Sequence, residues 1–218
     1  LKGGDANMAH FIVYDLIRAK KEAEYPDIRP LKRRLLIQPS YDEVMRYIAY
    51  CRKQESVAYD IETRGMSLSH ISFATESDLA MCIPFAEGAK DIWDPNQEAA
   101  IMLEIAKLLE DTNVVKIGQN LSFDCTFMYR RYGIHVRPID DTMIAAAILY
   151  PDFPKGLDFL TSIYCDGEPY YKADGKNWMK NPVGNDDLFR RYNAMDSAVL
   201  MEIWPKQKEE LLRCDNFE

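Results

Sequence analysis

Apolar and polar residues alternate along residues 56–65, SVAYDIETRG, which is typical of a β-strand. Successive side chains of a strand point to opposite faces, so Tyr59 and Ile61 share one face while Asp60 and Glu62 share the other. Two carboxylates held this close repel each other, and burial raises the cost. The pattern therefore predicts a cation or an exposed cleft beside this strand.

The hydrophobic pattern downstream predicts a mixed α/β sheet. Residues 70–75 and 79–85 are apolar runs joined by a short polar turn, which is typical of two further strands. Residues 113–120, NVVKIGQN, read as a fourth, short apolar strand that ends in a glycine turn, and residues 94–109 before it have apolar positions at helical spacing. A strand that follows a crossover helix normally lies parallel to its predecessor, so the sheet is expected to combine both directions.

Capping signals give the bounds of the helices around this fourth strand. Asp94 is an N-cap, Pro95 takes the first helical position, and Gln97 completes a capping box. A second helix is expected over residues 122–132, where Gly133 ends it.

The second half of the chain is mainly helical. The pattern predicts helices over residues 139–150 and 156–165, and another from residue 186 to the end that Pro205 interrupts. Between them, residues 166–185 form a polar loop rich in glycine and proline, and loops of this length usually have a function.

The first 34 residues differ from the rest, because a short apolar patch is followed by mixed charge and two prolines. We expect residues 1–34 to be a leader or linker with one helix over residues 10–23. Residues 35–218 are expected to form one domain, which opens with a helix over residues 41–54. Because the first residue is Leu instead of Met, we expect a processed product or a part of a longer protein. We favour an excised or separately made domain, with a freestanding protein as the alternative.

Composition limits the class of protein. With 218 residues, 47% of them hydrophobic, the chain can bury one full core. The net charge of -8 argues against high-affinity nucleic-acid binding driven by charge, although it leaves metal-mediated binding open. Five scattered cysteines signal neither a disulfide framework nor a zinc site, which favours a reducing compartment. The sequence holds no apolar run long enough to cross a bilayer, so we expect a soluble protein without a membrane partner.

Two further acids lie where a site is expected. Asp124 lies at the start of a helix that follows a strand, and Asp196 lies in the last helix with Tyr192 one turn before it. If Asp60, Glu62, Asp124 and Asp196 converge, two divalent cations would neutralise them, and ligands that are all oxygen suit Mg or Mn. Such a pair of cations can clamp the attacking and leaving oxygens of phosphodiester hydrolysis.

Each of these residues also has an ordinary structural explanation. An Asp-x-Glu pair is common on a solvated sheet face, Asp124 is favoured by the helix dipole, and a tyrosine in a helix is more often core than catalyst. The order and placement of the three motifs together favour a site. Asp140 and Asp141 precede an apolar helix and are interpreted as its N-cap, and the isolated His10, His70 and His135 as surface or satisfied core histidines.

The motifs resemble a known family. DIE on the first strand, NLSFD after the fourth and YNAMD on the late helix are similar to the three motifs of DEDD-type 3′-to-5′ exonucleases of the tyrosine subclass. KIGQNLSFDCTFMYRRYGI, DDTMIAAAILY and RRYNAMDSAVLMEIWP more closely resemble the proofreading domain of family A DNA polymerases, the bacterial DNA polymerase I group and its phage relatives. The likeness covers residues 35–213.

The resemblance implies a fold and a set of roles. The fold is the α/β RNase H-like (DnaQ-like) fold, with a mixed central sheet of about five strands flanked by helices. In this family the four acids hold two metals and the tyrosine helps to position the attacking water. Those roles fall on Asp60, Glu62, Asp124, Asp196 and Tyr192.

The resemblance also implies contacts with the substrate. Met66 takes the place of a side chain that wedges against the terminal base, and Asn120 that of a residue that contacts the strand. Thr63 is expected to bind substrate with them. Apart from the resemblance, Tyr170 and Tyr171 either pack within their loop or stack on a base, and Tyr171 is our candidate for stacking.

Three functions remain open on the sequence. The favoured one is a metal-dependent exonuclease that releases 5′-mononucleotides from single-stranded DNA 3′ ends beside a polymerase domain, in cis or in trans. The expected location is the cytoplasm of a bacterial or phage-infected cell, with an organelle not excluded. The alternatives are an exoribonuclease similar to RNase D and a catalytically silent nucleic-acid-binding or scaffold domain.

Overall fold

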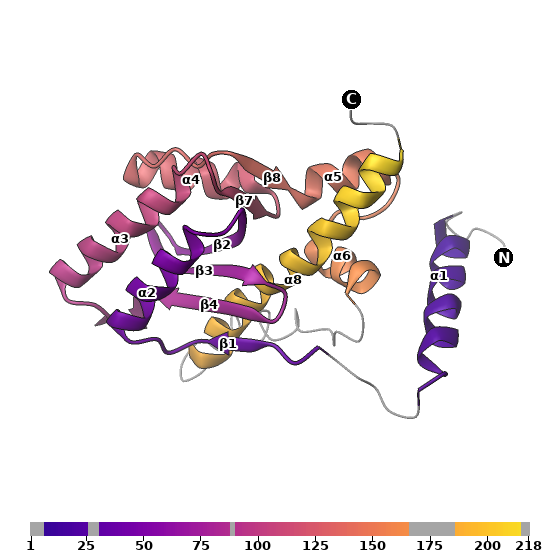
Figure 1. The fold of residues 1–218 in the computed structure, drawn as a ribbon, viewed down its shortest axis with the longest axis horizontal. Helices are drawn as coiled ribbons and strands as arrows, with labels where there is room; N and C mark the ends of the chain where they lie inside the picture. Colours follow the sequence, from indigo (N-terminus) through magenta and orange to yellow (C-terminus); the bar gives the residue numbers. More distant parts are fainter. Residues whose placement is uncertain (1–6, 26–30, 88–89, 166–185, 215–218) are drawn as a thin grey trace.

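The computed structural model describes residues 7–25, 31–87, 90–165 and 186–214. Its centre is a six-stranded sheet in the order β1-β4-β3-β2-β7-β8 (Figure 1). The strands are β1 (Arg34–Leu36), β2 (Ser56–Arg64), β3 (Ser67–Glu76), β4 (Leu79–Pro84), β7 (Val115–Gly118) and β8 (Ile139–Asp141). β3 runs antiparallel to β2 and β4, whereas the other neighbours are parallel. The sheet is therefore mixed, as the sequence predicts.

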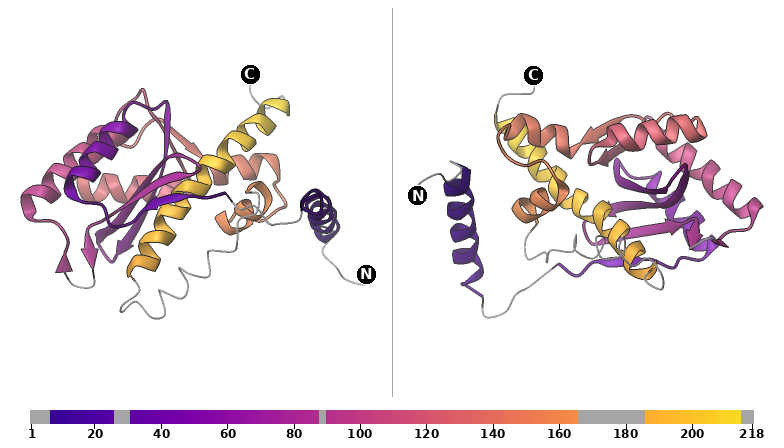
Figure 2. Two further views of the ribbon diagram at one scale, coloured as in Figure 1. Left: turned by 60° about the horizontal axis from the view of Figure 1, so that its bottom comes forward. Right: turned by 180° about the vertical axis from the view of Figure 1, so that it is seen from behind.

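Helices cover both faces of this sheet (Figure 2). The helices are α1 (Asn7–Glu22), α2 (Tyr41–Cys51), α3 (Pro95–Leu109), α4 (Leu121–Tyr132), α5 (Thr142–Leu149), α6 (Leu157–Tyr164) and α8 (Asp186–Arg213). One buried cluster joins α2, α3 and α4 to one face, and a second joins α5, α6 and α8 to the other. A further pair, β5 (Ala86–Glu87) and β6 (Lys90–Asp91), forms a small separate ribbon.

The two faces of β2 have the residues that the alternation predicts. Tyr59 and Ile61 pack in the cluster of α2 and α3, while Ala58 packs in the cluster of α8. Ala194 and Ala198 of α8 are fully buried in that same cluster. Small side chains on both surfaces let the helix approach the sheet closely, and this brings α8 over the acidic face of β2.

Two short strands were not predicted as strands. β1 and β8 have three residues each, too few to show a period in the sequence. The helix expected to begin at residue 139 begins instead at Thr142, because Ile139–Asp141 pairs with β7. The sheet consequently has six strands where the sequence predicted about five.

Other helix bounds largely agree with the sequence. α3 has the predicted capping box, in which Asp94 accepts from the N–H of Gln97, and α4 ends at Gly133 with φ of 71°. α2 ends at Cys51, shorter than predicted. α8 continues through Pro205, so the predicted interruption there is wrong.

The predicted helix in the first 34 residues is present as α1, beside α6 (Figures 1 and 2). Arg18 donates hydrogen bonds to the carbonyl oxygens of Ser162, at 2.7 Å, and Cys165, at 2.9 Å, and the Tyr14 hydroxyl donates to the carbonyl of Ile163. Among the residues described, none of the helices is long and apolar enough to cross a membrane.

Candidate active site

The centre of the site is a cluster of three carboxylates from two elements. Asp60 and Glu62 project from β2, and Asp196 projects from α8, which lies across that strand. One carboxylate oxygen from each residue lies within 4.8 Å of the others. Asp196 is only 3% exposed, so repulsion within the cluster is not relieved by full hydration. The arrangement can hold a divalent cation.

Asp124 lies beside this cluster and is anchored to β2. Its Oδ1 atom accepts a hydrogen bond of 3.1 Å from the main-chain N–H of Ile61, the residue between Asp60 and Glu62. The pairing of β2 with β7 extends only to Ala58, so the carboxylate serves as a partner for β2 beyond the end of that ladder. Burial raises the pKa of Asp124 to about 7, with the charge of Asp141 acting in the same direction and the Ile61 N–H opposing it.

A β-bulge follows the second acid of the strand. Glu62 lies opposite His70, but Thr63 lies opposite Leu68, so β3 has one extra residue, Ser69, opposite the step from Glu62 to Thr63. The Ser69 hydroxyl donates to the carbonyl oxygen of Glu62 at 2.9 Å and fixes the bulge. A bulge bends the strand that carries the extra residue, so the pairing of β3 with β2 changes between the acidic positions of β2 and the turn that follows.

Tyr192 lies one helical turn before Asp196 and is hydrogen-bonded to it. Its ring stacks on Phe189 with centroids 5.9 Å apart, and Phe189 in turn meets the edge of His70 at 5.0 Å. Burial raises the pKa of the Tyr192 phenol, and the charges of Asp196, Glu62 and Asp60 raise it further. The phenol therefore stays protonated at neutral pH and can donate or orient, but it cannot act as a base.

His70 differs from its sequence interpretation. It is fully buried, and its Nε2 atom has no hydrogen-bond partner among the described residues. Burial, with the charges of Arg190 and Arg64 acting in the same direction, lowers the pKa of the imidazole to about 3. His70 is thus a neutral core histidine, but not a fully satisfied one.

Asp141 is the N-cap of α5, as predicted, because its carboxylate accepts from the N–H of Met143 at 2.8 Å. The same carboxylate also accepts from the N–H groups of Asn120, at 3.0 Å, and Leu121, at 2.8 Å. Asn120 has φ of 58°, a left-handed conformation that asparagine tolerates better than most residues. Asp141 therefore supports the start of α4, on which Asp124 lies.

A pocket of about 560 Å³ lies between the β2–β3 turn and α4. Three of the predicted substrate residues, Thr63, Met66 and Asn120, line it. The remaining lining residues are Gly65, Ser122, Phe123, Thr126, Phe127, Arg130 and Arg131. The fourth predicted substrate residue, Tyr171, lies outside the described residues, as does Tyr170.

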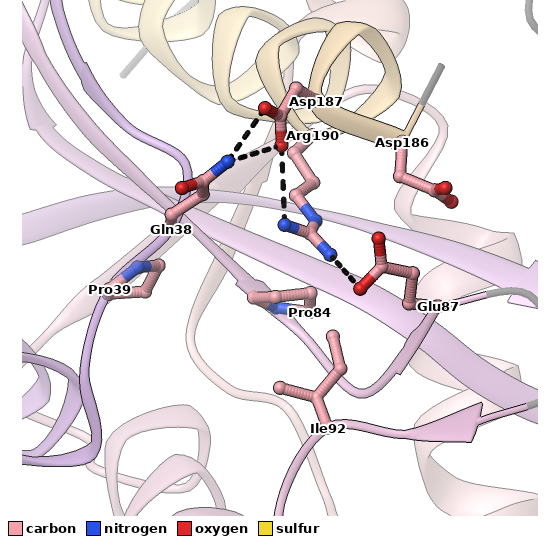
Figure 3. Close-up of a pocket in the computed structure, with 8 residues that line it drawn as sticks. All are labelled: Gln38, Pro39, Pro84, Glu87, Ile92, Asp186, Asp187 and Arg190. Atoms are coloured by element: carbon pink, nitrogen blue, oxygen red, sulfur yellow. Dashed lines mark hydrogen bonds and ion pairs between the residues drawn. The ribbon is translucent and has the colours of Figure 1, made fainter. Parts of the chain in front are cut away.

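A second pocket, of about 470 Å³, lies at the start of α8 (Figure 3). The buried guanidinium of Arg190 sits between Glu87, at 3.4 Å, and Asp187, at 3.3 Å, and Gln38 donates to Asp187 at 2.6 Å (Figure 3). These contacts join the first turn of α8 to the β5–β6 ribbon and to the segment after β1. They hold in place the part of the helix that carries Tyr192.

A comparison with known families shows which kind of protein has this site. Residues 38–212 match the family model for the 3′–5′ exonuclease of family A DNA polymerases. The chain belongs to this family. It is thus a 3′-to-5′ exonuclease domain, as the sequence motifs predict. Exonucleases of this family use divalent metal, and the three clustered carboxylates fit such ions because all their ligand atoms are oxygen.

Known proteins show how much of the chain is shared. DNA polymerase I of Rhizobium leguminosarum is 33% identical over 109 residues, which are 48% of this chain and 11% of that polymerase. The catalytic core of RRP6 from Trypanosoma brucei has a TM-score of 0.65 at 16% identity, covering 93% of this chain and 56% of the other. Escherichia coli RNase D has a TM-score of 0.60 at 18% identity, covering 84% and 46%. The structural likenesses show the RNase H-like α/β fold, which confirms the predicted fold class.

Sequence reasoning missed several residues around this site. Asn193, which contacts Asp60, and His70, which lies opposite Glu62, were not assigned to the site. The one available signal for Asn193 was its position, directly after Tyr192 and three residues before Asp196. The signal for His70 was its alternation with Ser72 and Ala74, which places it on the same face of the sheet as Asp60 and Glu62.

Proposed function

We propose that this exonuclease domain removes 5′-mononucleotides from the 3′ end of single-stranded DNA, as the proofreading module of a family A polymerase. Asp60, Glu62, Asp124 and Asp196 are proposed to hold two divalent cations, Mg or Mn. The observation that carries the proposal is the approach of three carboxylates from β2 and α8 to within 4.8 Å, with the buried Asp124 beside them. Mutually repelling acids at this spacing gain little unless a cation binds them.

Each residue of the site is proposed to have a separate role in hydrolysis. Bound cations neutralise the carboxylates, lower the pKa of a water molecule and stabilise the charge that develops on the phosphate. Asp60, the first acid of β2, is proposed to contact both cations. Tyr192 orients the attacking water by a hydrogen bond, since its raised pKa keeps the phenol protonated. Glu62, on the same face of β2, accepts a hydrogen bond from that water.

The pocket along α4 is the proposed binding place for the end of the strand. Met66 is 71% exposed at its rim, where its apolar side chain can wedge against a terminal base. Asn120 and Thr63 supply polar contacts in the same pocket, and Tyr171 is the candidate for stacking from the loop. Phe123 is 53% exposed and offers a second aromatic surface.

The strand is proposed to continue toward Arg130 and Arg131, which line the far part of this pocket. Both side chains are exposed on a protein with a net charge of -8. Phe127, one turn before them, stacks on Phe123 with centroids 6.4 Å apart. Aromatic rings beside arginines suit a single strand, because bases stack on the rings and phosphates pair with the guanidinium groups.

A polymerase domain is the proposed partner, in cis or in trans. The aligned segment covers 11% of the DNA polymerase I relative, so any activity beyond this domain belongs to this proposal. Residues 35–218 are proposed as the exonuclease domain and residues 1–34 as a leader or linker. The described cysteines are all free, which fits the cytoplasm of a bacterial or phage-infected cell.

One assay tests the proposal. End-labelled single-stranded DNA and RNA of the same sequence are incubated with the protein in Mg, Mn or EDTA, beside Asp60→Ala and the surface control Asp111→Asn. We expect one-nucleotide shortening from the 3′ end of DNA, lost in EDTA and in Asp60→Ala but kept in Asp111→Asn. Activity that survives EDTA contradicts the metal site. A faster reaction on RNA favours the RNase D-like alternative, whose fold this chain shares.

A further inference from the structure

Asn193 contacts the first acid of the candidate metal site. It is fully buried on α8, directly after Tyr192. Its Nδ2 atom donates a hydrogen bond of 2.7 Å to Oδ2 of Asp60 and lies 3.4 Å from the carbonyl oxygen of the same residue. An amide donor to a carboxylate is a charge-assisted hydrogen bond, which is stronger than one between neutral groups.

The main chain of Asn193 is fixed to the sheet by a second contact. The Ser72 hydroxyl donates to the carbonyl oxygen of Asn193 at 2.7 Å and lies 2.6 Å from the hydroxyl of Ser197. Ser72 is also the residue opposite Asp60 in the β2–β3 register. Asp60 and the amide that contacts it are therefore positioned by the same point on β3, which sets how α8 lies over the acidic face of β2.

The orientation of the amide follows from the charge of Asp60. The reverse orientation would place the Asn193 Oδ1 atom against an ionised carboxylate oxygen, where two acceptors repel. In the observed orientation Oδ1 is buried and has no hydrogen-bond partner among the described residues. An unsatisfied buried oxygen is costly, so this amide is poorly suited to a purely structural role in the core. Within the described part of the chain, its side-chain hydrogen bonds go to Asp60 alone.

We propose that Asn193 is a positioning residue for Asp60. By holding Oδ2 it fixes the rotation of the carboxylate and leaves the other oxygen directed to the cation before the ion arrives. Groups that hold metal ligands in this way raise metal affinity, and their loss typically weakens binding by about 10- to 100-fold. This inference rests on the proposed metal site, and it assigns Asn193 a role through Asp60 without contact to substrate.

The test compares Mn²⁺ binding, measured by isothermal titration calorimetry, in wild type and Asn193→Ala. Gln207→Ala is the matched control, because Gln207 is a second fully buried amide of α8 with one hydrogen bond, to the carbonyl of Thr142, and one unpartnered oxygen. We expect Asn193→Ala to bind Mn²⁺ roughly tenfold more weakly and to need correspondingly more Mn²⁺ for half-maximal activity. Gln207→Ala should bind as wild type does. Unfolding midpoints are recorded for each variant.

The outcomes separate this inference from the proposed function. If wild type itself does not bind Mn²⁺, the metal site is wrong. If wild type binds Mn²⁺ and Asp60→Ala binds it much more weakly, but Asn193→Ala binds like Gln207→Ala while only its stability falls, Asn193 is an ordinary core residue and the inference is overturned. In the Asp60→Ala background, adding Asn193→Ala should change the residual affinity no further, and an additive loss would place its action elsewhere. Asn193→Ser, whose hydroxyl is too short to reach Asp60, serves if the alanine variant does not fold.

Discussion

The Oδ1 atom of Asp124 accepts a hydrogen bond from the N–H of Ile61, the residue that separates Asp60 from Glu62 on β2. This bond spans 63 positions of sequence and joins the start of α4 to the strand that carries two of the acids. Because the donor is a main-chain N–H group, the carboxylate of Asp124 is held in place without a side chain of β2 as its partner. The acids therefore have a defined arrangement before any cation binds, which lowers the cost of binding one.

Replacing this acid tests its charge separately from its hydrogen bond. Asp124→Asn keeps an oxygen that can accept from Ile61 but removes the charge that a cation needs. We expect exonuclease activity to fall by about 100-fold or more, because a neutral side chain holds the cation less well and the cation stabilises the transition state. End-labelled DNA degradation measures it. Asp158→Asn, which changes a half-buried acid in the first turn of α6, should leave the rate unchanged. Full activity in Asp124→Asn would remove Asp124 from the site.

The same variant should gain stability without metal. The folded pKa of about 7 lies above the ordinary 3.8, so the folded chain holds a proton that the unfolded chain releases between about pH 4 and 7. The stability present below this window is lost as pH rises through it. In EDTA at pH 8 we expect Asp124→Asn to be more stable than wild type by about 1 to 3 kcal/mol, and at pH 4 to show little difference. Urea unfolding at both pH values measures this, and an equal difference at both would contradict it.

Removing only the hydroxyl of Tyr192 tests its role with water. Tyr192→Phe keeps the stack on Phe189 but loses the hydrogen bond between the Tyr192 hydroxyl and Asp196. We expect kcat to fall by roughly 10- to 100-fold while Mn²⁺ affinity and the unfolding midpoint stay close to wild type. Tyr150→Phe, which removes a hydroxyl bonded to Glu210, is the control and should keep kcat. Weaker Mn²⁺ binding in Tyr192→Phe would instead make the tyrosine a part of the metal site.

The exposed arginines of α4 should act on substrate binding alone. Replacing both Arg130 and Arg131 with glutamine removes two charges beside the pocket. We expect KM for single-stranded DNA to rise about tenfold with little change in kcat. The slope of log affinity against log salt concentration should become shallower by about one to two, which corresponds to the loss of one or two phosphate contacts. Kinetics at several salt concentrations measure both. Arg213→Gln, an exposed arginine at the far end of α8, should change neither value. An unchanged salt dependence would exclude α4 from the path of the strand.

The fold could be predicted where an element is long enough to repeat its pattern. β2 and α3 follow from alternation and from a capping box, which are local properties of the chain. β1 and β8 could not, because three residues contain no period and each forms only by pairing with a strand already in place. The path of α8 through Pro205 reflects packing against the sheet before the proline and against α5 and α6 beyond it, which can override the local preference of a proline.

The site could be predicted only in part. Asp60 and Glu62 follow from alternation, and Asp124, Asp196 and Tyr192 were candidates from their places on the predicted helices, whereas the resemblance to a family supplied their roles. Asn193 meets Asp60 across 133 positions of sequence, and that contact exists only because α8 crosses β2. No local pattern reports such a contact, so the residues that support the acids had to come from the structure.

His70 provides a pH-dependent test of how tightly α8 covers the sheet. Its folded pKa of about 3, set by burial and then by Arg190 and Arg64, lies below the ordinary 6.5, so stability is full above about pH 6.5 and falls as pH drops toward 3. His70→Phe keeps a ring against Phe189 but cannot take up a proton. Between pH 7 and pH 5 in EDTA, wild type should lose about 2 kcal/mol more than this variant in urea unfolding. The exposed His135→Phe should lose as much as wild type. Equal losses in wild type and His70→Phe would mean that the imidazole takes up its proton in the folded state, and that α8 does not exclude water from this face of β3.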